Sequence, residues 1–266
     1  MTIRVAINGA LGKMGKTVVS AVHADPELEL VAAIDLHGNN INLSSLSGLE
    51  EIDLPVNSDL AAALKQTKPD VVIDFTSPFT VMQNIETALL HKVRPVVGTT
   101  GITEADLTKI TAWSEQYQTP AFIAPNFAIG AVLMMLFSVQ AAKFLPHVEI
   151  IELHHDQKLD APSGTALKTA EMINKVRQKK QAAKEAELEK VPHVRGGSVE
   201  GIHIHSVRLP GYVAHQEVIF GGIGQTLSIR HDSMDRTSFI PGVLMSVKAV
   251  MKQEGVIYGL ENILSL

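Results

Sequence analysis

Two adjacent histidines and a nearby lysine make residues 154–158 the part of this 266-residue chain best equipped for proton transfer. His154 and His155 stand together, and Lys158 follows four residues after the first of them. Imidazole and ammonium groups donate protons and bind negatively charged groups. The segment lies in a polar loop between an expected strand and an expected helix. These residue types predict acid–base chemistry beside an anionic ligand.

The same loop ends in residues suited to a carboxylate. Ser163, Gly164 and Thr165 supply two hydroxyls and the N–H groups that a helix leaves unpaired in its first turn. Metal binding is the competing interpretation for His154 and His155. We disfavour it, and predict no metal, because adjacent strand residues point apart and no HxxxH or HExxH spacing accompanies them.

Other candidate groups are left without a role. A Ser–His–Asp hydrolase is excluded because the chain has no GxSxG elbow. His203 and His205 alternate on one expected strand face, where solvated polar residues explain them at least as well as a metal pair. Arg195 and Arg208 are lone cations for which surface solvation is the default interpretation and contact with an anionic substrate is the alternative.

A glycine turn near the start has the context of a dinucleotide-binding loop. Gly9, Gly12 and Gly15 follow an expected strand and open an expected helix, and Asp35 ends the second strand twenty residues past Gly15. Such a turn presents N–H groups to a pyrophosphate that only residues without a Cβ let approach, while the acid binds the ribose hydroxyls. The alternatives are structural glycines and a turn cap at Asp35. The spacing is GxxGxxG rather than GxGxxG.

Asp35 also bears on the type of cofactor. A carboxylate repels a 2′-phosphate, and Leu36 offers no guanidinium to attract one, so NADH is expected to bind well. His37, Lys13 and Lys16 can still partly neutralise a phosphate, so use of NADPH stays open.

Three further turns follow expected strands. Residues 98–101 (Gly-Thr-Thr-Gly) and 124–127 (Ala-Pro-Asn-Phe) each come directly after one. Ligands of an open parallel sheet bind outside the carboxyl ends of its strands, so both turns are expected at the crevice that holds the glycine loop. For the third turn, residues 74–76, a buried strand-end cap and a ligand role are equally favoured.

The elements that position these residues fall into two regions. Up to residue 127, apolar strands alternate with helices, which predicts an α/β fold with a Rossmann-type parallel sheet covered on both faces. The expected strands are 3–7, 28–34, 71–75, 95–97 and 121–124. The first expected helix opens at the glycine turn, and the later ones cover 59–65, 78–91 and 103–117.

Beyond residue 127 the pattern predicts an α+β domain with an open mixed sheet. A long apolar helix (128–144) precedes a strand (148–153), a helix from Gly164, and three alternating segments (203–209, 217–220 and 226–231) expected to pair antiparallel. The charged stretch 175–190 is read as a solvated helix or mobile flap. Asp235 is expected to cap a last helix (237–251), and 256–266 is read as a tail. The expected domains are 1–127 with 236–266 for the dinucleotide, and 128–235 for substrate and tetramer contacts.

Composition narrows the functional class. The formal net charge of −5 lacks the basic excess of nucleic-acid-binding proteins, and zero cysteines remove disulfides and suit a reducing compartment. The most apolar later stretch, 128–139, is shorter than the roughly 20 residues that span a bilayer. With no leader pattern at the start, we expect a cytoplasmic protein without nucleic-acid or membrane partners.

The quoted motifs, above all the segment from Glu152 to Ala166 (ELHHDQKLDAPSGTA), resemble the 4-hydroxy-tetrahydrodipicolinate reductase family, also called dihydrodipicolinate reductases. The resemblance covers essentially the whole chain. It implies NAD(P)H-dependent reduction of 4-hydroxy-tetrahydrodipicolinate, through dihydrodipicolinate, to tetrahydrodipicolinate in the diaminopimelate route to lysine. It also implies a homotetramer built by the sheet of the substrate domain. Leu36 departs from the Arg that many members carry, which puts strong NADPH preference in doubt.

The resemblance also implies residue roles. His154 matches the proton donor and acceptor and Lys158 the second proton donor. Matching the substrate-carboxylate positions are His155, Ser163, Gly164 and Thr165. Matching the cofactor contacts are Gly9, Ala10, Gly12, Lys13, Met14, Asp35, Gly98, Thr99, Thr100, Ala124, Pro125, Asn126 and Phe127. Two alternatives stay open: a Rossmann reductase of another amino-acid-derived carbonyl, and an NADH-binding regulatory protein without turnover.

Overall fold

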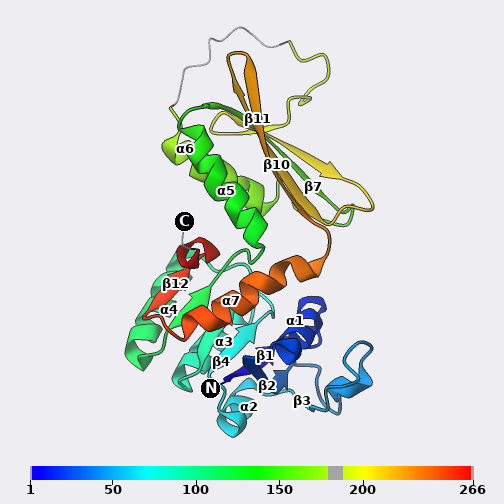
Figure 1. Ribbon diagram of the computed structural model, residues 1–266, viewed down its shortest axis with the longest axis vertical. Helices are drawn as coiled ribbons and strands as arrows, with labels where there is room; N and C mark the ends of the chain where they lie inside the picture. The colour runs from blue at the N-terminus through cyan, green and yellow to red at the C-terminus, as the bar shows by residue number, and fades with distance from the viewer. Residues whose placement is uncertain (1, 179–187, 265–266) are drawn as a thin grey trace. The chain divides into compact units, whose positions relative to one another are not determined.

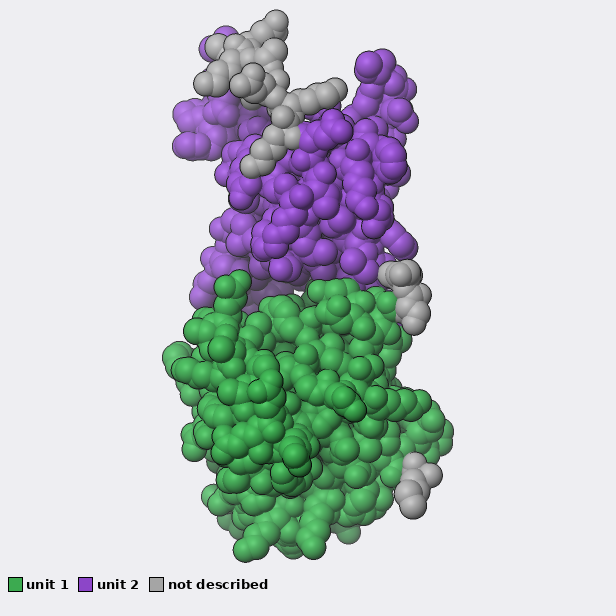
Figure 2. Space-filling model, turned by 90° about the vertical axis from the view of Figure 1, so that its left-hand side faces the viewer, with its two compact units in different colours: residues 1–127, 239–266 green, residues 128–238 purple. Residues whose placement is uncertain are grey.

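The computed structural model of the protein describes residues 2–178 and 188–264. The chain forms two compact units, drawn in different colours in Figure 2. Unit 1 comprises residues 1–127 and 239–266, and unit 2 comprises residues 128–238. The chain re-enters unit 1 at residue 239, whereas the sequence pattern predicts the domain boundary at 236.

Unit 1 is built on a seven-stranded sheet in the order β12-β6-β5-β4-β1-β2-β3, in which every neighbouring pair is parallel. This confirms the expected Rossmann-type sheet. Its strands are β1 (Ile3–Asn8), β2 (Leu28–Ile34), β3 (Val56–Asn57), β4 (Val71–Asp74), β5 (Arg94–Val97), β6 (Ala121–Ile123) and β12 (Val256–Tyr258). In register, Asn8 pairs with Asp74, and Asp74 with Val97. Strand ends that carry polar side chains therefore lie at one edge.

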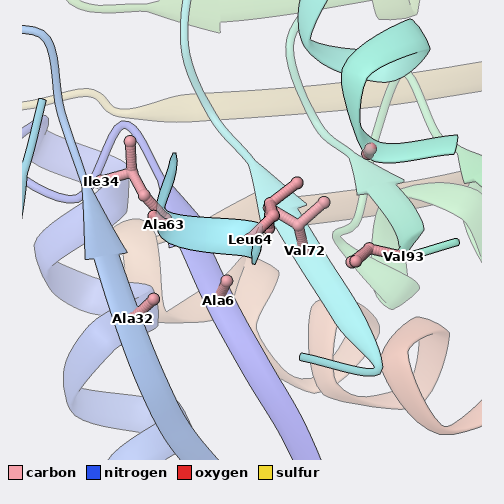
Figure 3. Close-up of a cluster of buried hydrophobic side chains, with 8 residues drawn as sticks. Ala6, Ala32, Ile34, Ala63, Leu64, Val72 and Val93 are labelled. Atoms are coloured by element: carbon pink, nitrogen blue, oxygen red, sulfur yellow. The ribbon is translucent and has the colours of Figure 1, made fainter. Parts of the chain in front are cut away.

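Helices cover this sheet (Figure 1). Ala63 and Leu64 of α2 pack with Ala6, Ala32 and Val72 of the sheet in a buried apolar cluster (Figure 3). Val5 and Ile7, which alternate with Ala6 along β1, are also fully buried, so the sheet is covered on both faces. The helices are α1 (Lys13–Ala24), α2 (Leu60–Thr67), α3 (Val81–Leu90), α4 (Glu104–Tyr117) and α7 (Ile240–Val250).

Two expectations for the end of the chain are wrong. Residues 256–266 are not simply a tail, because β12 pairs in parallel with β6 at the edge of the sheet. A three-residue strand is too short to show an alternating pattern, so the sequence could not reveal it. Asp235 does not cap the last helix. It accepts a hydrogen bond from the Thr237 N–H (2.7 Å) before a 3₁₀ turn, Arg236–Phe239, and α7 begins only at Ile240.

Unit 2 has a five-stranded mixed sheet in the order β11-β10-β7-β9-β8. Strand β10 is antiparallel to β11, as expected, and also to β7. The expected antiparallel pairing of segment 203–209 with segment 217–220 is wrong, because β9 lies between β7 and β8 and is parallel to β7. The parallel pair arises because α6 lies between these two strands in the chain and serves as the crossover that parallel pairing requires. The strands are β7 (His147–His154), β8 (Gly197–Val199), β9 (Ile202–Arg208), β10 (Ala214–Gly222) and β11 (Gln225–Ser233).

Two helices, α5 (Ile129–Ala142) and α6 (Gly164–Val176), cover one face of this sheet. That face carries Val148, Ile150 and Glu152 of β7, all buried. α6 ends at Val176, and residues 179–187 of the charged stretch 175–190 lie outside the described residues, so the expectation for that stretch stays a prediction. In residues 2–178 and 188–264, no helix is both long and apolar enough to cross a membrane.

Candidate functional site

The glycine turn of unit 1 is sterically demanding. Gly9 has a φ of +86°, and a Cβ placed on it would lie 2.4 Å from the carbonyl oxygen of Phe75. A Cβ on Gly15 would lie 2.0 Å from the Gly9 carbonyl oxygen. Both positions require glycine for the turn to close against β4 and α1.

Several N–H groups of this turn hold the loop itself. The N–H groups of Gly9 and Ala10 donate to the Ile34 carbonyl (2.8 and 2.9 Å), and that of Leu11 donates to the Asp35 carboxylate (3.1 Å). The donors left for an anion are therefore at the start of α1, where Gly12 is an N-cap without a side-chain hydrogen bond. A helix leaves its first N–H groups, here from Lys13 onward, without intrahelical acceptors.

A cleft of about 830 Å³ lies next to this turn, entirely within unit 1. Its size suits a cofactor-scale ligand. Of the predicted cofactor residues, it is lined by Gly9, Gly12 and Asp35. Residues that sequence reasoning missed complete the lining, because their approach depends on how β3, α2 and α3 pack; they include Asn8, Ser58, Asp59, Thr80, Gln83 and Asn84.

Asp35 acts as a turn cap and also lines the cleft. Its carboxylate accepts hydrogen bonds from the N–H groups of Leu11 (3.1 Å) and His37 (3.0 Å). Both interpretations of this residue are thus compatible with the geometry. A second carboxylate, Asp59, lines the same cleft, and no lysine or arginine stands among the described residues around it.

Asp74, at the end of β4, is a buried carboxylate surrounded by neutral donors. It accepts hydrogen bonds from the amides of Asn8 (2.8 Å) and Asn84 (2.9 Å). The hydroxyls of Thr76 (2.8 Å) and Thr99 (2.7 Å) donate to it as well. The strand-end cap interpretation of residues 74–76 therefore describes Asp74, while Thr76 and Asn84 line the cleft.

Of the remaining predicted cofactor residues, some are buried in packing contacts and others are exposed at the surface. Gly98 allows close approach of the Phe75 ring, since a Cβ there would lie 2.1 Å from Cε1. Phe127 is buried, with its ring centroid 5.9 Å from that of Phe75. Ala10 and Ala124 are buried, and Lys13, Thr100 and Pro125 are exposed; these five, with Met14, Thr99 and Asn126, are not among the residues that line the cleft.

In unit 2, His154 stands at the end of β7 and is held by a buried carboxylate. The Nδ1 atom of His154 lies 2.5 Å from Oε2 of Glu152, whose side chain is fully buried. Arg208 of β9 binds the two carboxylate oxygens of Glu152 through Nη1 (2.9 Å) and Nη2 (2.8 Å). Residues 152 and 154 share a face because strand side chains alternate.

Electrostatics keep this carboxylate ionised. Burial raises the pKa of Glu152, but hydrogen bonds from His154, Arg208 and Ser206 outweigh it and hold the pKa at about 2. An ionised carboxylate only accepts hydrogen bonds, so the Nδ1 atom of His154 carries the proton between them. The ring's Nε2 is then the position at which a proton is gained or lost.

The loop after His154 is tied to the same arginine. Nη2 of Arg208 donates to the Asp160 carbonyl (2.8 Å), and Nζ of Lys158 binds the Asp160 carboxylate (2.7 and 2.8 Å). The hydrogen bond from Lys158, with weaker effects of Arg208 and the backbone, lowers the pKa of Asp160. His155 is exposed on this loop. Arg208 thus joins the strand that carries His154 to the loop that carries Lys158.

Ser163 is the N-cap of α6. Its Oγ accepts from the Ala166 N–H (3.2 Å), so one hydroxyl expected for a ligand already serves the helix. Gly164 is exposed, and a Cβ on it would meet nothing within 4 Å, so its backbone lies open. Thr165 follows in the first turn. The helix start keeps the N–H donors that suit a carboxylate.

A second Glu–His–Arg cluster joins Glu149 of β7 to His205 of β9 and Arg195, and its carboxylate points to the other side of the sheet. Glu149 accepts from Nε2 of His205 (2.8 Å) and from Arg195. Its side chain keeps 33% of its surface exposed, as against 0% for Glu152. Among residues 2–178 and 188–264, no group of three or more His, Asp or Glu side chains is placed to hold a metal.

In unit 2, Glu152 and Arg208 complete the arrangement around His154, and sequence reasoning assigned a role to neither. A signal for Glu152 was present, since a Glu two residues before a His on a strand shares its face. Arg208 gave no such signal, because its contact with Glu152 spans 56 residues and depends on the β7–β9 pairing.

Comparison with known proteins covers both units. A family model described as "Dihydrodipicolinate reductase, N-terminus" matches residues 3–127, and one described as "Dihydrodipicolinate reductase, C-terminus" matches residues 130–264. Similar curated relatives include a 4-hydroxy-tetrahydrodipicolinate reductase of Halalkalibacterium halodurans, 53% identical over 98% of this chain and 99% of the relative. One of Geobacillus kaustophilus is 53% identical over 99% of this chain and 100% of the relative.

A solved structure with the same fold is a dipicolinate-bound dihydrodipicolinate reductase from Paenisporosarcina sp. TG-14. It is 46% identical to this chain with a TM-score of 0.86, and the alignment covers 99% of this chain and 100% of that one.

Proposed function

Because this chain belongs to the dihydrodipicolinate reductase family, we propose that unit 1 holds NADH and that the loop of unit 2 supplies the protons for the reaction. Membership makes the chain an oxidoreductase, a 4-hydroxy-tetrahydrodipicolinate reductase of the diaminopimelate route to lysine, that uses a pyridine nucleotide. The single observation that carries the residue assignment is His154, whose imidazole is held by the fully buried carboxylate of Glu152.

The nucleotide fits the cleft of unit 1. When bound, a reduced nicotinamide supplies the hydride that reduces the cyclic imine. The start of α1 offers N–H groups to the pyrophosphate, and Gly9 and Gly12 line the cleft beside it. Asp35 keeps acceptor capacity beyond its two backbone hydrogen bonds and would bind the ribose hydroxyls.

Preference for NADH over NADPH is supported by the charge of this cleft. Asp35 and Asp59 both line it, and no lysine or arginine stands among the described residues around it. A 2′-phosphate would thus meet two carboxylates without a guanidinium to offset them. Leu36, at the rim, is 72% exposed and adds no charge.

His154 and Lys158 are proposed as the two proton donors. Addition of hydride to a conjugated imine leaves an electron-rich enamine, whose adjacent carbon must take a proton from a nearby acid. The Nε2 atom of His154 is the exchangeable position, since Nδ1 is bound to Glu152. The ammonium of Lys158, paired with Asp160, carries the second transferable proton.

The substrate carboxylates are proposed to bind at the start of α6 and at His155. Gly164 presents an open backbone there, and the first-turn donors of α6 point along the helix axis. The relative from Paenisporosarcina sp. TG-14 is described as dipicolinate-bound, which supports a small cyclic dicarboxylate. Ser163 and Thr165 would add hydroxyl donors.

Two wider properties belong to the proposal: assembly as a homotetramer through the sheet of unit 2, and a cytoplasmic location. Sedimentation of the purified chain at micromolar concentration tests the tetramer, and a monomer there would contradict it.

Steady-state kinetics test the residue assignments. With NADH and freshly prepared substrate, His154→Gln or Lys158→Ala should lower turnover by about 10²–10⁴, the range for a lost proton donor. Lys175→Ala, in an exposed ion pair of α6, is the matched control and should leave turnover unchanged. Full turnover in both site variants would contradict the assignments.

Substrate and ligand controls separate the alternatives. A reductase of open-chain carbonyls would reduce aldehydes that this chain should reject. A regulatory protein would bind NADH tightly and reduce no cyclic imine.

A further inference from the structure

We propose that Glu152 and Arg208 form a positioning pair that fixes both proton donors, the ring of His154 and the loop that carries Lys158. The inference rests on the proposed function for the roles of those two donors. Neither Glu152 nor Arg208 is proposed to touch the reacting atoms.

Glu152 selects the form of the imidazole. Its carboxylate is fully buried and bound by both terminal nitrogens of Arg208, so it stays an acceptor and draws the proton of His154 to Nδ1. The imidazole of His154 then exchanges a proton only at Nε2, on the side of the ring away from the Glu152 carboxylate. A carboxylate in this place orients a ring and stabilises its protonated form.

Arg208 extends the same control to the loop. Its Nη2 also donates to the carbonyl of Asp160 (2.8 Å), whose carboxylate holds Nζ of Lys158 (2.7 Å). The side chain of Arg208 is only 19% exposed, so its guanidinium is fixed between the sheet and the loop. One cation therefore sets the distance between two elements that each supply a proton donor.

The surroundings leave few other groups to do this. On β10, the residue opposite His154 is Ala214, and the residue opposite Glu152 is Gln216, whose amide donates to Thr169 of α6 (2.8 Å). Among the described residues, Glu152 is the charged group hydrogen-bonded to His154, and Arg208 is the cation that binds Glu152; Lys158 and Asp160 lie one contact further away.

The cluster of Glu149, His205 and Arg195 provides a matched comparison, because Glu149 lies on the same strand as Glu152. It has the same three residue types and a comparable His–Glu hydrogen bond (2.8 Å), but its carboxylate is partly exposed and points to the opposite face of the sheet. Glu149→Gln is therefore the control for Glu152→Gln, since each removes one charge and keeps the shape.

The first measurement uses the unmodified protein. With histidine labelled by ¹⁵N, the neutral ring of His154 should show the Nδ1–H tautomer, identified by the loss of its signals in His154→Gln. A predominant Nε2–H tautomer would overturn the proposal, whatever the variants do.

The second measurement is kinetic. Glu152→Gln should lower kcat roughly 100-fold, change the KM for NADH by less than twofold, and raise the fraction of the Nε2–H tautomer. Glu149→Gln should change none of the three. If folded Glu152→Gln, checked by its CD spectrum, retains kcat within twofold, the pair does not position the donor.

Arg208→Lys keeps the charge but loses the two-pronged contact, and should show a smaller loss of kcat than Glu152→Gln. If Arg208→Lys keeps the kcat of the wild type, the two-pronged contact of Arg208 does not position the proton donors. Should His154→Gln leave turnover unchanged, the proposed function fails, while the tautomer result still decides the inference about Glu152.

Discussion

Each unit holds one buried carboxylate at a strand end, and the two carboxylates are satisfied in different ways. Asp74 in unit 1 is surrounded by amides and hydroxyls from Asn8, Thr76, Asn84 and Thr99. Glu152 in unit 2 is bound by an arginine and a histidine. The first network is neutral apart from its acid, and the second pairs charge with charge.

The two networks differ in whether a group bound to the acid can gain or lose a proton. Neutral donors cannot change charge near neutral pH, so the Asp74 network fixes the shape of a cleft wall and nothing else. A histidine can change charge, and an arginine cannot lose its own, so the Glu152 network keeps one proton-exchanging group in a defined orientation. A buried acid held by neutral groups thus indicates rigidity in unit 1, whereas the buried acid of unit 2 has the role in proton transfer that we propose for it.

The largest expected effect is on stability when the cation beside Glu152 is removed. Arg208→Met leaves a buried carboxylate without its partner and should lower the free energy of unfolding by about 3–5 kcal/mol. Arg195→Met, which removes the partner of the exposed Glu149, should cost about 1 kcal/mol or less. Denaturant unfolding of the two variants measures both, and equal losses would mean that burial does not distinguish the clusters.

The pH dependence of stability should show the same charge pairing. The pKa of Glu152 is about 2 in the folded chain, against an ordinary value of 4.5. Its ionisation thus contributes roughly 3 kcal/mol that is fully present above pH 4.5 and is lost as pH falls toward 2. Glu152→Gln should flatten the fall in unfolding free energy across this range. A curve as steep as that of the wild type would contradict the assignment.

The neutral network should respond to loss of charge more mildly. Asp74→Asn replaces one accepting oxygen by an NH₂ donor, among groups such as the amides of Asn8 and Asn84 that themselves donate to Asp74. The variant should lower the free energy of unfolding by about 1–3 kcal/mol. NADH should bind more weakly, because the cleft wall is part of this network. Asp53→Asn, whose carboxylate accepts only at an exposed site from Asn42, is the control. Calorimetric titration with NADH checks the binding.

The smallest effect is expected at the solvated rim of the cleft. Leu36→Arg adds a guanidinium at a largely exposed position, where an ion pair is worth about 0.2–1 kcal/mol. The KM for NADPH should therefore fall by only roughly two- to fivefold, with little change for NADH. A complete switch to NADPH would show that the cleft is more enclosed in solution than its rim indicates.

Much of the fold could be predicted from local patterns. The strand Leu28–Ile34 and the capped start of α4 at Thr103 follow from apolar runs and short-range capping chemistry. The short strands β3, β8 and β12 could not be predicted, since two or three residues carry no periodicity and form only because a neighbouring strand offers its edge.

For the site, the sequence by itself determined which groups can do chemistry: the histidines and lysine of residues 154–158, the helix start after Ser163, and the glycine turn. These lie close together in the chain, so residue type and spacing are enough to identify them. Tertiary structure alone decided what holds them, because Arg208 reaches Glu152 and Asp160, and Asn84 reaches Asp74, only after distant strands and helices have packed.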